Sequence, residues 1–154
     1  MAEVDIRDEM VVRAPISTVW QAIKNPAVHA AWHPFVTSIS GEHEQGAVRR
    51  CVIRIGKKDG HTEERCSACE HESRILWRID RDSTGFSGMV SDWTAGFLLK
   101  PEASNETLVT ATSVFRPRRW FVRLMLPFVR RKFHQTQIAI LTGLKEHVEG
   151  RGDH

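Results

Sequence analysis

The spacing of apolar and polar residues changes along the chain and predicts helices near both ends with strands between them. Residues 4–13 alternate loosely between apolar and polar side chains, which is typical of a strand. Two short helices are expected next, over residues 18–23 and 27–32, separated by a break at Asn25-Pro26.

The middle of the chain consists of short segments rich in Val, Ile, Thr and aromatic residues, separated by turn residues. Short strands joined by short turns predict an antiparallel sheet. The expected strands cover residues 36–44, 47–56, 61–70, 74–81, 86–100 and 107–115.

The last third of the chain has helical spacing. Pro127 must kink or interrupt this region, because proline removes a backbone donor and clashes with the preceding turn. Beyond it, apolar residues and one glutamine recur on one face of a long terminal helix, and residues 150–154 are expected to be a frayed tail. The stripe consists of Phe133, Gln137, Ile140, Leu141, Leu144 and Val148.

Length and composition are those of an ordinary folded domain. The chain has 154 residues, 41% hydrophobic and 27% charged, with no tyrosine to act as an acid or base. No apolar run is long enough to span a membrane, and the acidic N-terminus does not resemble a signal peptide. We therefore expect a cytoplasmic protein.

Three segments carry a resemblance to a known family. They are Ala14-Pro15 with the helical residues 16–23, the segment Trp32-His33-Pro34-Phe35, and Arg116-Pro117-Arg118 with the closing helix. Their order is similar to that of the START/Bet v 1-like (SRPBCC) superfamily, and within it to bacterial polyketide cyclase/dehydrase proteins.

The resemblance implies an α+β helix-grip fold. In this fold a curved antiparallel β-sheet wraps around a long C-terminal α-helix, and two short helices follow the first strand. Residues 1–149 would form a single domain of this type. The family also implies an apolar cavity between sheet and helix that binds lipid-like or polyketide-like molecules.

Strand alternation indicates which residues would line such a cavity, because every second side chain faces the same side of a sheet. The alternative is that these side chains only pack against the terminal helix. The candidate cavity residues are Trp32, Ile53, Trp77, Met89, Ser91, Trp93, Phe97, Ser113, Phe115 and Phe128.

Two residues are weak candidates for acid–base chemistry. His33 lies at the expected cavity mouth, where it could transfer a proton or simply sit on the rim. Glu64 could face inward with a partner such as Arg54, or form an ion pair with a neighbouring strand on the solvent side. The sequence fixes no second catalytic group beside either one.

The cysteines do not indicate a metal or redox site. Cys66 and Cys69 have C-x-x-C spacing, but mid-strand this spacing places them on opposite faces, and no second pair completes a zinc site. We expect no metal and no cofactor.

Positive charge is concentrated near the terminal helix. Residues 107–145 contain eight basic residues and no acid, whereas residues 1–106 have 13 basic and 16 acidic residues. Such a segment could contact an anionic membrane, or its cations could pair with the acidic sheet. No nucleic-acid motif is present. The arginines that could contact a membrane are Arg116, Arg118, Arg119, Arg123, Arg130 and Arg131.

Three hypotheses remain from the sequence. The favoured one is a carrier or sensor that holds a small hydrophobic molecule, because no convergent acid–base pair is visible. The second is a polyketide cyclase or dehydratase that uses the same cavity, so enzyme status stays open. The third is a module that binds a membrane or a partner through the basic helix.

Overall fold

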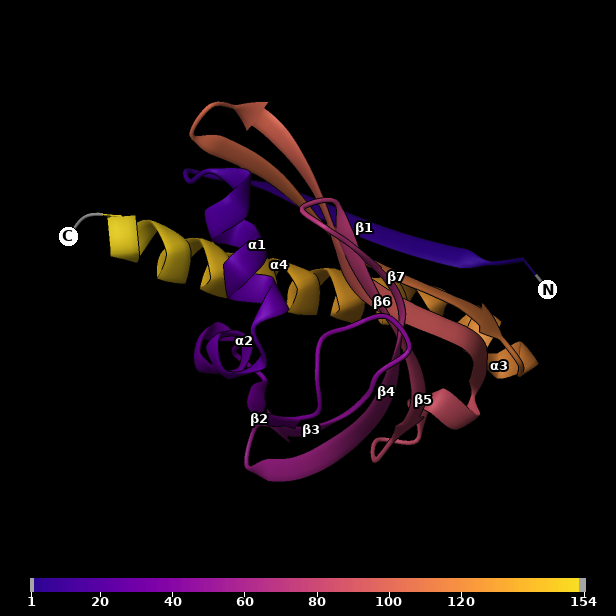
Figure 1. Ribbon diagram of the computed structural model, residues 1–154. Helices are drawn as coiled ribbons and strands as arrows, with labels where there is room; N and C mark the ends of the chain where they lie inside the picture. The colour runs from indigo at the N-terminus through magenta and orange to yellow at the C-terminus, as the bar shows by residue number, and fades with distance from the viewer. Residues whose placement is uncertain (1, 153–154) are drawn as a thin grey trace.

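A curved antiparallel sheet and a long C-terminal helix make up most of the structure (Figure 1). The computed structural model describes residues 2–152. The strands are β1 (Val4–Val12), β2 (Val36–Ser40), β3 (Val48–Ile55), β4 (Lys58–Glu70), β5 (Arg74–Asp82), β6 (Val90–Ala103) and β7 (Glu106–Pro117). The helices are α1 (Ile16–Lys24), α2 (Pro26–Trp32), α3 (Trp120–Leu124) and α4 (Leu126–Gly152), with a 3-10 turn, η1, at Phe86–Gly88.

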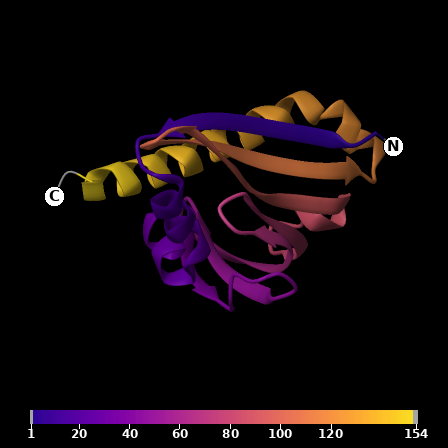
Figure 2. The ribbon, with the colours of Figure 1, turned by 45° about the horizontal axis from the view of Figure 1, so that its top comes forward.

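The sheet order is β1-β7-β6-β5-β4-β3-β2, and every neighbouring pair is antiparallel. The first strand therefore pairs with the last one, and β1 and β2 form opposite edges of the sheet. Helices α1 and α2 connect these two edges, and α4 packs along β1 and β7 (Figure 2). The predicted helix-grip arrangement is confirmed.

Several predicted boundaries differ from the observed ones. β2 ends at Ser40 rather than at residue 44, and residues 86–88 form η1 before β6 begins at Val90. The predicted tail is helical as far as Gly152, and residues 153–154 lie outside the described part of the chain. No helix in residues 2–152 has the length and apolarity needed to cross a bilayer.

Local sequence signals account for the helix boundaries. The Asn25 side chain accepts a hydrogen bond from the Ala27 amide (3.1 Å), and Pro26 occupies the first turn of α2. Pro127 likewise lies in the first turn of α4, where it has no helical hydrogen bond to lose. The predicted interruption therefore falls at Met125, between α3 and α4.

The core has two parts. The larger cluster joins α1 and the C-terminal half of α4 to the sheet through side chains such as Trp20, Ile75 and Leu144. The smaller cluster surrounds the fully buried Phe115 and contacts the start of α4 through Phe133. Burial of these aromatic and aliphatic side chains supplies most of the driving force for folding.

Helix α4 approaches α2 closely at Gly143. A Cβ at this position would lie 2.8 Å from the carbonyl oxygen of Trp32, so glycine permits the contact. The Trp32 indole also donates to the Ala22 carbonyl (2.8 Å), which fixes α2 against α1. These contacts hold the end of α2, and with it His33, at a defined position.

Candidate functional site

A cavity of about 210 Å³ lies between the inner face of the sheet and α4. Members of both core clusters line it, including Trp77 and Phe97 from the larger and Trp93 and Phe133 from the smaller. The lining is mainly apolar, with a few polar groups. This is the usual composition of a small-molecule site.

The main polar group in the cavity wall is a buried ion pair. Arg49 on β3 is 7% exposed and donates through Nε (3.2 Å) and Nη2 (2.8 Å) to Oε1 of Glu64 on β4, which is 8% exposed. Thr62 donates to the other carboxylate oxygen of Glu64 (2.6 Å). Both oxygens of Glu64 are therefore engaged.

Arg49 has two further contacts that fix its orientation. Its guanidinium carbon lies 3.8 Å from the ring centroid of Trp77, in a cation–π contact. Its Nη1 donates to Nε2 of His43 (2.8 Å). Arginine has five N–H groups, so one on each terminal nitrogen remains without a partner among residues 2–152. A ligand oxygen in the cavity could accept from these groups.

The hydrogen bond from Arg49 determines the state of His43. Because Arg49 can only donate, Nε2 of His43 accepts, and its Nδ1–H donates to the Ile23 carbonyl (3.1 Å). Burial and the nearby Arg49 charge lower the pKa of His43 to about 4. This imidazole is neutral at physiological pH.

His29 and His33 stack on each other with ring centroids 5.3 Å apart, and both line the cavity. Nδ1 of His33 accepts from the Phe35 and Val36 amides (3.1 Å each), so its proton is on Nε2. Burial, reinforced by Arg49, lowers the pKa of His33 to about 3, and burial also lowers the pKa of His29 well below its ordinary value. Neutral imidazoles of this kind are hydrogen-bonding groups and weak bases.

The opposite wall contains a second set of hydrogen bonds. Ser113 on β7 donates to Oε1 of Gln137 on α4 (2.8 Å), and Nε2 of Gln137 donates to Asp8 on β1 (2.7 Å). Asp8 also contacts His134 (2.9 Å). This network joins α4 to two strands and places polar atoms of Ser113 and Gln137 in the wall.

Trp93 also lines the cavity, and its indole nitrogen is buried without a hydrogen-bond partner. A buried N–H without a partner is costly, because it has lost its hydrogen bonds to water. Asp92, directly before it, has a positive φ of 53° within a bulge of β6, and this bulge sets the direction of Trp93.

The candidate residues from the sequence divide into two groups. The cavity wall contains Ile53, Trp77, Trp93, Phe97 and Ser113, together with His33 and Glu64. The others lie elsewhere: Trp32 is buried in the larger cluster, Met89 and Phe115 belong to the smaller cluster, and Ser91 is half-buried on β6 opposite Arg116.

Phe128 was expected in the cavity and instead lies on the surface, 73% exposed. It precedes Phe133 by five residues, which on a helix places it about 140° around the axis from that inward side chain.

The other expectation to correct concerns the partner of Glu64. Its partner is the buried Arg49, while Arg54 forms an exposed pair with Asp59.

Arg49, His29 and Gln137 are cavity residues that the sequence reading did not assign to the site. Arg49 is two residues before Cys51 and four before Ile53, so alternation places it on their inward face. Charged side chains are mostly exposed in folded proteins, so an inward arginine is not expected from residue type. Gln137 was part of the predicted inward stripe of the helix, and only its role in the cavity wall was missed.

Cys66 and Cys69 lie closer to one face than expected. A bulge between Cys66 and Ala68 shifts the register of β4, so both cysteines contact the larger core cluster. All three cysteines are free thiols, and burial raises the pKa of Cys51 and Cys66 to about 11 each. Residues 2–152 contain no group of three or more His, Cys, Asp or Glu side chains arranged to hold a metal ion.

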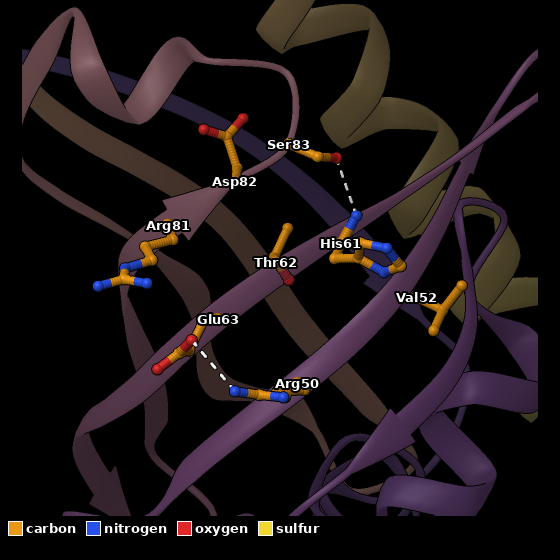
Figure 3. A pocket seen from close by; sticks show the side chains of 8 residues that line it. All are labelled: Arg50, Val52, His61, Thr62, Glu63, Arg81, Asp82 and Ser83. Carbon is orange, nitrogen blue, oxygen red and sulfur yellow. Dashed lines mark hydrogen bonds and ion pairs between the residues drawn. The ribbon is translucent and has the colours of Figure 1, made fainter.

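A second, open depression lies over β3, β4 and the end of β5 (Figure 3). Arg50, His61 and Glu63 line it, and they alternate with the inward-facing Arg49, Thr62 and Glu64 along the same strands. Its Arg50–Glu63 ion pair is long, 3.8 Å, and largely exposed. An exposed pair of this kind contributes little binding energy, so the internal cavity is the better candidate site.

Known structures resemble this fold over nearly its whole length. The Zhui aromatase/cyclase from a Streptomyces species has a TM-score of 0.76 at 17% identity, covering 97% of this chain and 96% of its own. A START superfamily protein from Mycobacterium smegmatis has a TM-score of 0.77 at 13% identity, with 95% and 97% covered. Norcoclaurine synthase from Thalictrum flavum has a TM-score of 0.75 at 11% identity, with 98% and 97% covered. At these identities the likeness shows a shared fold.

The sequence itself identifies the family. No curated protein matches the chain. Residues 3–149 match the family described as polyketide cyclase/dehydrase and lipid transport. Because this match spans nearly all of the chain, the protein belongs to the polyketide cyclase/dehydrase and lipid transport family.

Proposed function

We propose that this protein binds a compact hydrophobic molecule, with an aromatic body and one oxygen acceptor, as a carrier or sensor. The observation that carries the proposal is Arg49, a buried guanidinium with two free N–H groups in the wall of a mainly apolar cavity. Burial of the aromatic body would supply affinity, and the oxygen at Arg49 would set orientation.

The size of the cavity supports a compact ligand. Its volume of about 210 Å³ is below the roughly 300–1,000 Å³ typical of sites for drug-sized molecules. The aromatic side chains Trp77, Trp93 and Phe97 favour a flat, ring-containing body. The orphan indole N–H of Trp93 offers a second donor to such a ligand. The family description names polyketides and lipids, and a one- or two-ring molecule fits this cavity better than a long acyl chain.

The second candidate function is a cyclase or dehydratase reaction in the same cavity. Its support is that His33 and Glu64, the two acid–base candidates, both line the wall. The carrier is favoured because Glu64 already accepts hydrogen bonds at both oxygens, and His33 with a pKa of about 3 is a weak base.

The test is calorimetric titration with 2-naphthoate and with naphthalene, which lacks the oxygen acceptor. We expect 2-naphthoate to bind one molecule per chain, at least tenfold more tightly than naphthalene. The variant Ala95→Leu should abolish binding of both, because it fills the cavity between Trp77 and Ser113.

Two controls complete the test. Val52→Leu introduces a leucine on the outer face of β3 instead of inside the cavity. It should bind both compounds as the unaltered protein does. The double variant Arg49→Met/Glu64→Leu removes both charges without leaving one unpaired, and should bind the two compounds with similar affinity. Failure of 2-naphthoate to bind, or unchanged binding by folded Ala95→Leu, would contradict the proposal.

A further inference from the structure

An elbow between β7 and α4 carries a group of large apolar side chains on the protein surface. Trp120 is 71% exposed, Leu124 71% and Phe128 73%, and Phe121 and Met125 lie exposed beside them. The rings of Trp120 and Phe121 are 6.2 Å apart. Most large apolar residues in a folded protein are at least partly buried, so five exposed within nine residues mark an interaction surface. We call these five residues the apolar elbow.

Buried residues on the inner side of the apolar elbow anchor it to the protein core. Val122 is 3% exposed and packs in the smaller core cluster, with Leu126 and Val129 against the same cluster. The Arg118 amide donates to the Met89 carbonyl (3.0 Å), which ties the start of the elbow to η1. The exposed side chains therefore project from a packed support. Helix α3 and the start of α4, which carry these side chains, lie together at one end of the molecule (Figures 1 and 2).

Seven cations lie within the apolar elbow or a few residues from it in the sequence, and the chain has no acid between residues 107 and 145. Among residues 2–152 only one of the seven forms an ion pair, Arg116 with Glu3 at 3.9 Å. The interpretation that these cations pair with the acidic sheet is therefore not supported, and their charge faces solvent. The seven are Arg116, Arg118, Arg119, Arg123, Arg130, Arg131 and Lys132.

The positive charge and the projecting apolar side chains of the elbow indicate which partner binds it. A second copy of the chain packed symmetrically on the elbow would bring seven cations against seven cations, which opposes dimerisation. The surface of an anionic bilayer offers negative headgroups for the arginines and an apolar layer for the projecting Trp, Leu and Phe. Tryptophan in particular favours the boundary between headgroups and acyl chains.

We propose that the apolar elbow and its seven cations dock this protein on anionic phospholipid bilayers. Trp120, Leu124 and Phe128 insert at the interface, and the cations contact the headgroups. The inference does not depend on the proposed ligand, although Trp93 and Phe133 both pack under the elbow and line the cavity. Docking would thus bring this end of the cavity wall to the bilayer surface.

Vesicle co-sedimentation tests the proposal. We expect the protein to bind vesicles in which about one-third of the phosphatidylcholine is replaced by phosphatidylglycerol, and not to bind phosphatidylcholine alone. Binding should weaken as NaCl rises from about 0.1 to about 1 M, because the Debye length falls from about 10 to about 3 Å. Tryptophan emission should shift to the blue on binding, and Trp120→Phe should lose most of that shift.

Two variants matched in charge locate the contact. Arg119→Gln/Arg123→Gln/Arg130→Gln should weaken partitioning at least tenfold, since each cation near an anionic surface contributes roughly fivefold. Arg65→Gln/Arg81→Gln/Lys100→Gln removes the same charge from exposed strand positions and should weaken it much less. Far-UV circular dichroism confirms that both variants fold.

Three results would overturn the proposal. One is the absence of binding to the anionic vesicles. Another is equal binding by the two triple variants, which would place the contact elsewhere. The third is a dimer in analytical ultracentrifugation that Trp120→Ser/Leu124→Ser/Phe128→Ser converts to a monomer, since the face would then join two copies of the chain.

Discussion

The guanidinium of Arg49 lies 2.8 Å from the carboxylate of Glu64, and both buried side chains lie in the wall of the cavity between the sheet and α4. The two residues face each other from adjacent strands. Burying an ion pair costs desolvation of both charges, and here the cost is offset by Thr62, His43 and the ring of Trp77. Removal of either residue would therefore leave the other as a buried charge without its counter-ion.

This dependence predicts a large effect when one member is removed. Arg49→Met should lower the free energy of unfolding by about 3–5 kcal/mol, because Glu64 is left as a buried, unpaired charge. The double variant Arg49→Met/Glu64→Leu should recover most of the loss. Urea denaturation followed by tryptophan fluorescence measures both. A single variant as stable as the unaltered protein would show that the pair is not buried in solution.

Stability should depend on pH through His43. Its pKa in the folded protein is about 4, below the unfolded value of about 6.5. Above pH 6.5 His43 is neutral in both the folded and the unfolded state, so it does not make the free energy of unfolding depend on pH. As pH falls from 6.5 to 4, His43 binds a proton in the unfolded state but not in the folded state, so this residue alone lowers the free energy of unfolding by about 1.4 kcal/mol per pH unit.

The variant His43→Gln isolates this contribution. Glutamine retains an acceptor for Arg49 and does not titrate, so the variant should lose less stability between pH 6.5 and 4 than the unaltered protein. His61→Asn, at an exposed position, is the matched control substitution. Parallel profiles for His43→Gln and the unaltered protein would contradict the buried, neutral state of His43.

The α2–α4 contact predicts an unusual response to alanine. Replacing a helical glycine by alanine normally stabilises a helix by about 1 kcal/mol. At Gly143 the new methyl group would meet the Trp32 carbonyl at 2.8 Å, so Gly143→Ala should instead destabilise by about 1–3 kcal/mol. Gly150→Ala, with no neighbour within 4 Å, is the control and should stabilise slightly. Thermal unfolding compares the two, and the same sign for both would rule out the close contact.

His33→Asn separates the carrier from the enzyme. An asparagine side chain can still accept the Phe35 and Val36 amides, as in an Asx-turn, so the local structure should persist while the imidazole is lost. A carrier should keep its affinity for 2-naphthoate within a few fold. A cyclase that uses His33 for proton transfer should lose at least tenfold in turnover of a poly-carbonyl substrate. We expect the first result.

The order of elements and the inward stripe of α4 could be predicted from the sequence, because both depend on local periodicity. The predicted stripe residues Gln137, Leu141, Leu144 and Val148 are all buried. Phe128 could not be placed correctly, since the break at Met125 restarts the helix and its phase is set by packing on the smaller cluster.

The polar part of the cavity was harder to predict for a different reason. Alternation alone places Arg49 inward, but an inward arginine is acceptable only with its partners, which come from other segments of the chain. Glu64 is 15 residues away and His43 six. Bulges in β4 also shift the face of later residues, and they leave no clear mark in the sequence.

Native mass spectrometry of the freshly purified protein, before and after addition of 2-naphthoate, tests the central claim most directly. We predict one compact hydrophobic molecule per chain, either retained from purification or taken up as 2-naphthoate, and absent from Ala95→Leu under the same conditions. A protein that is empty as purified and forms no complex with 2-naphthoate would contradict the account of the cavity as a ligand site.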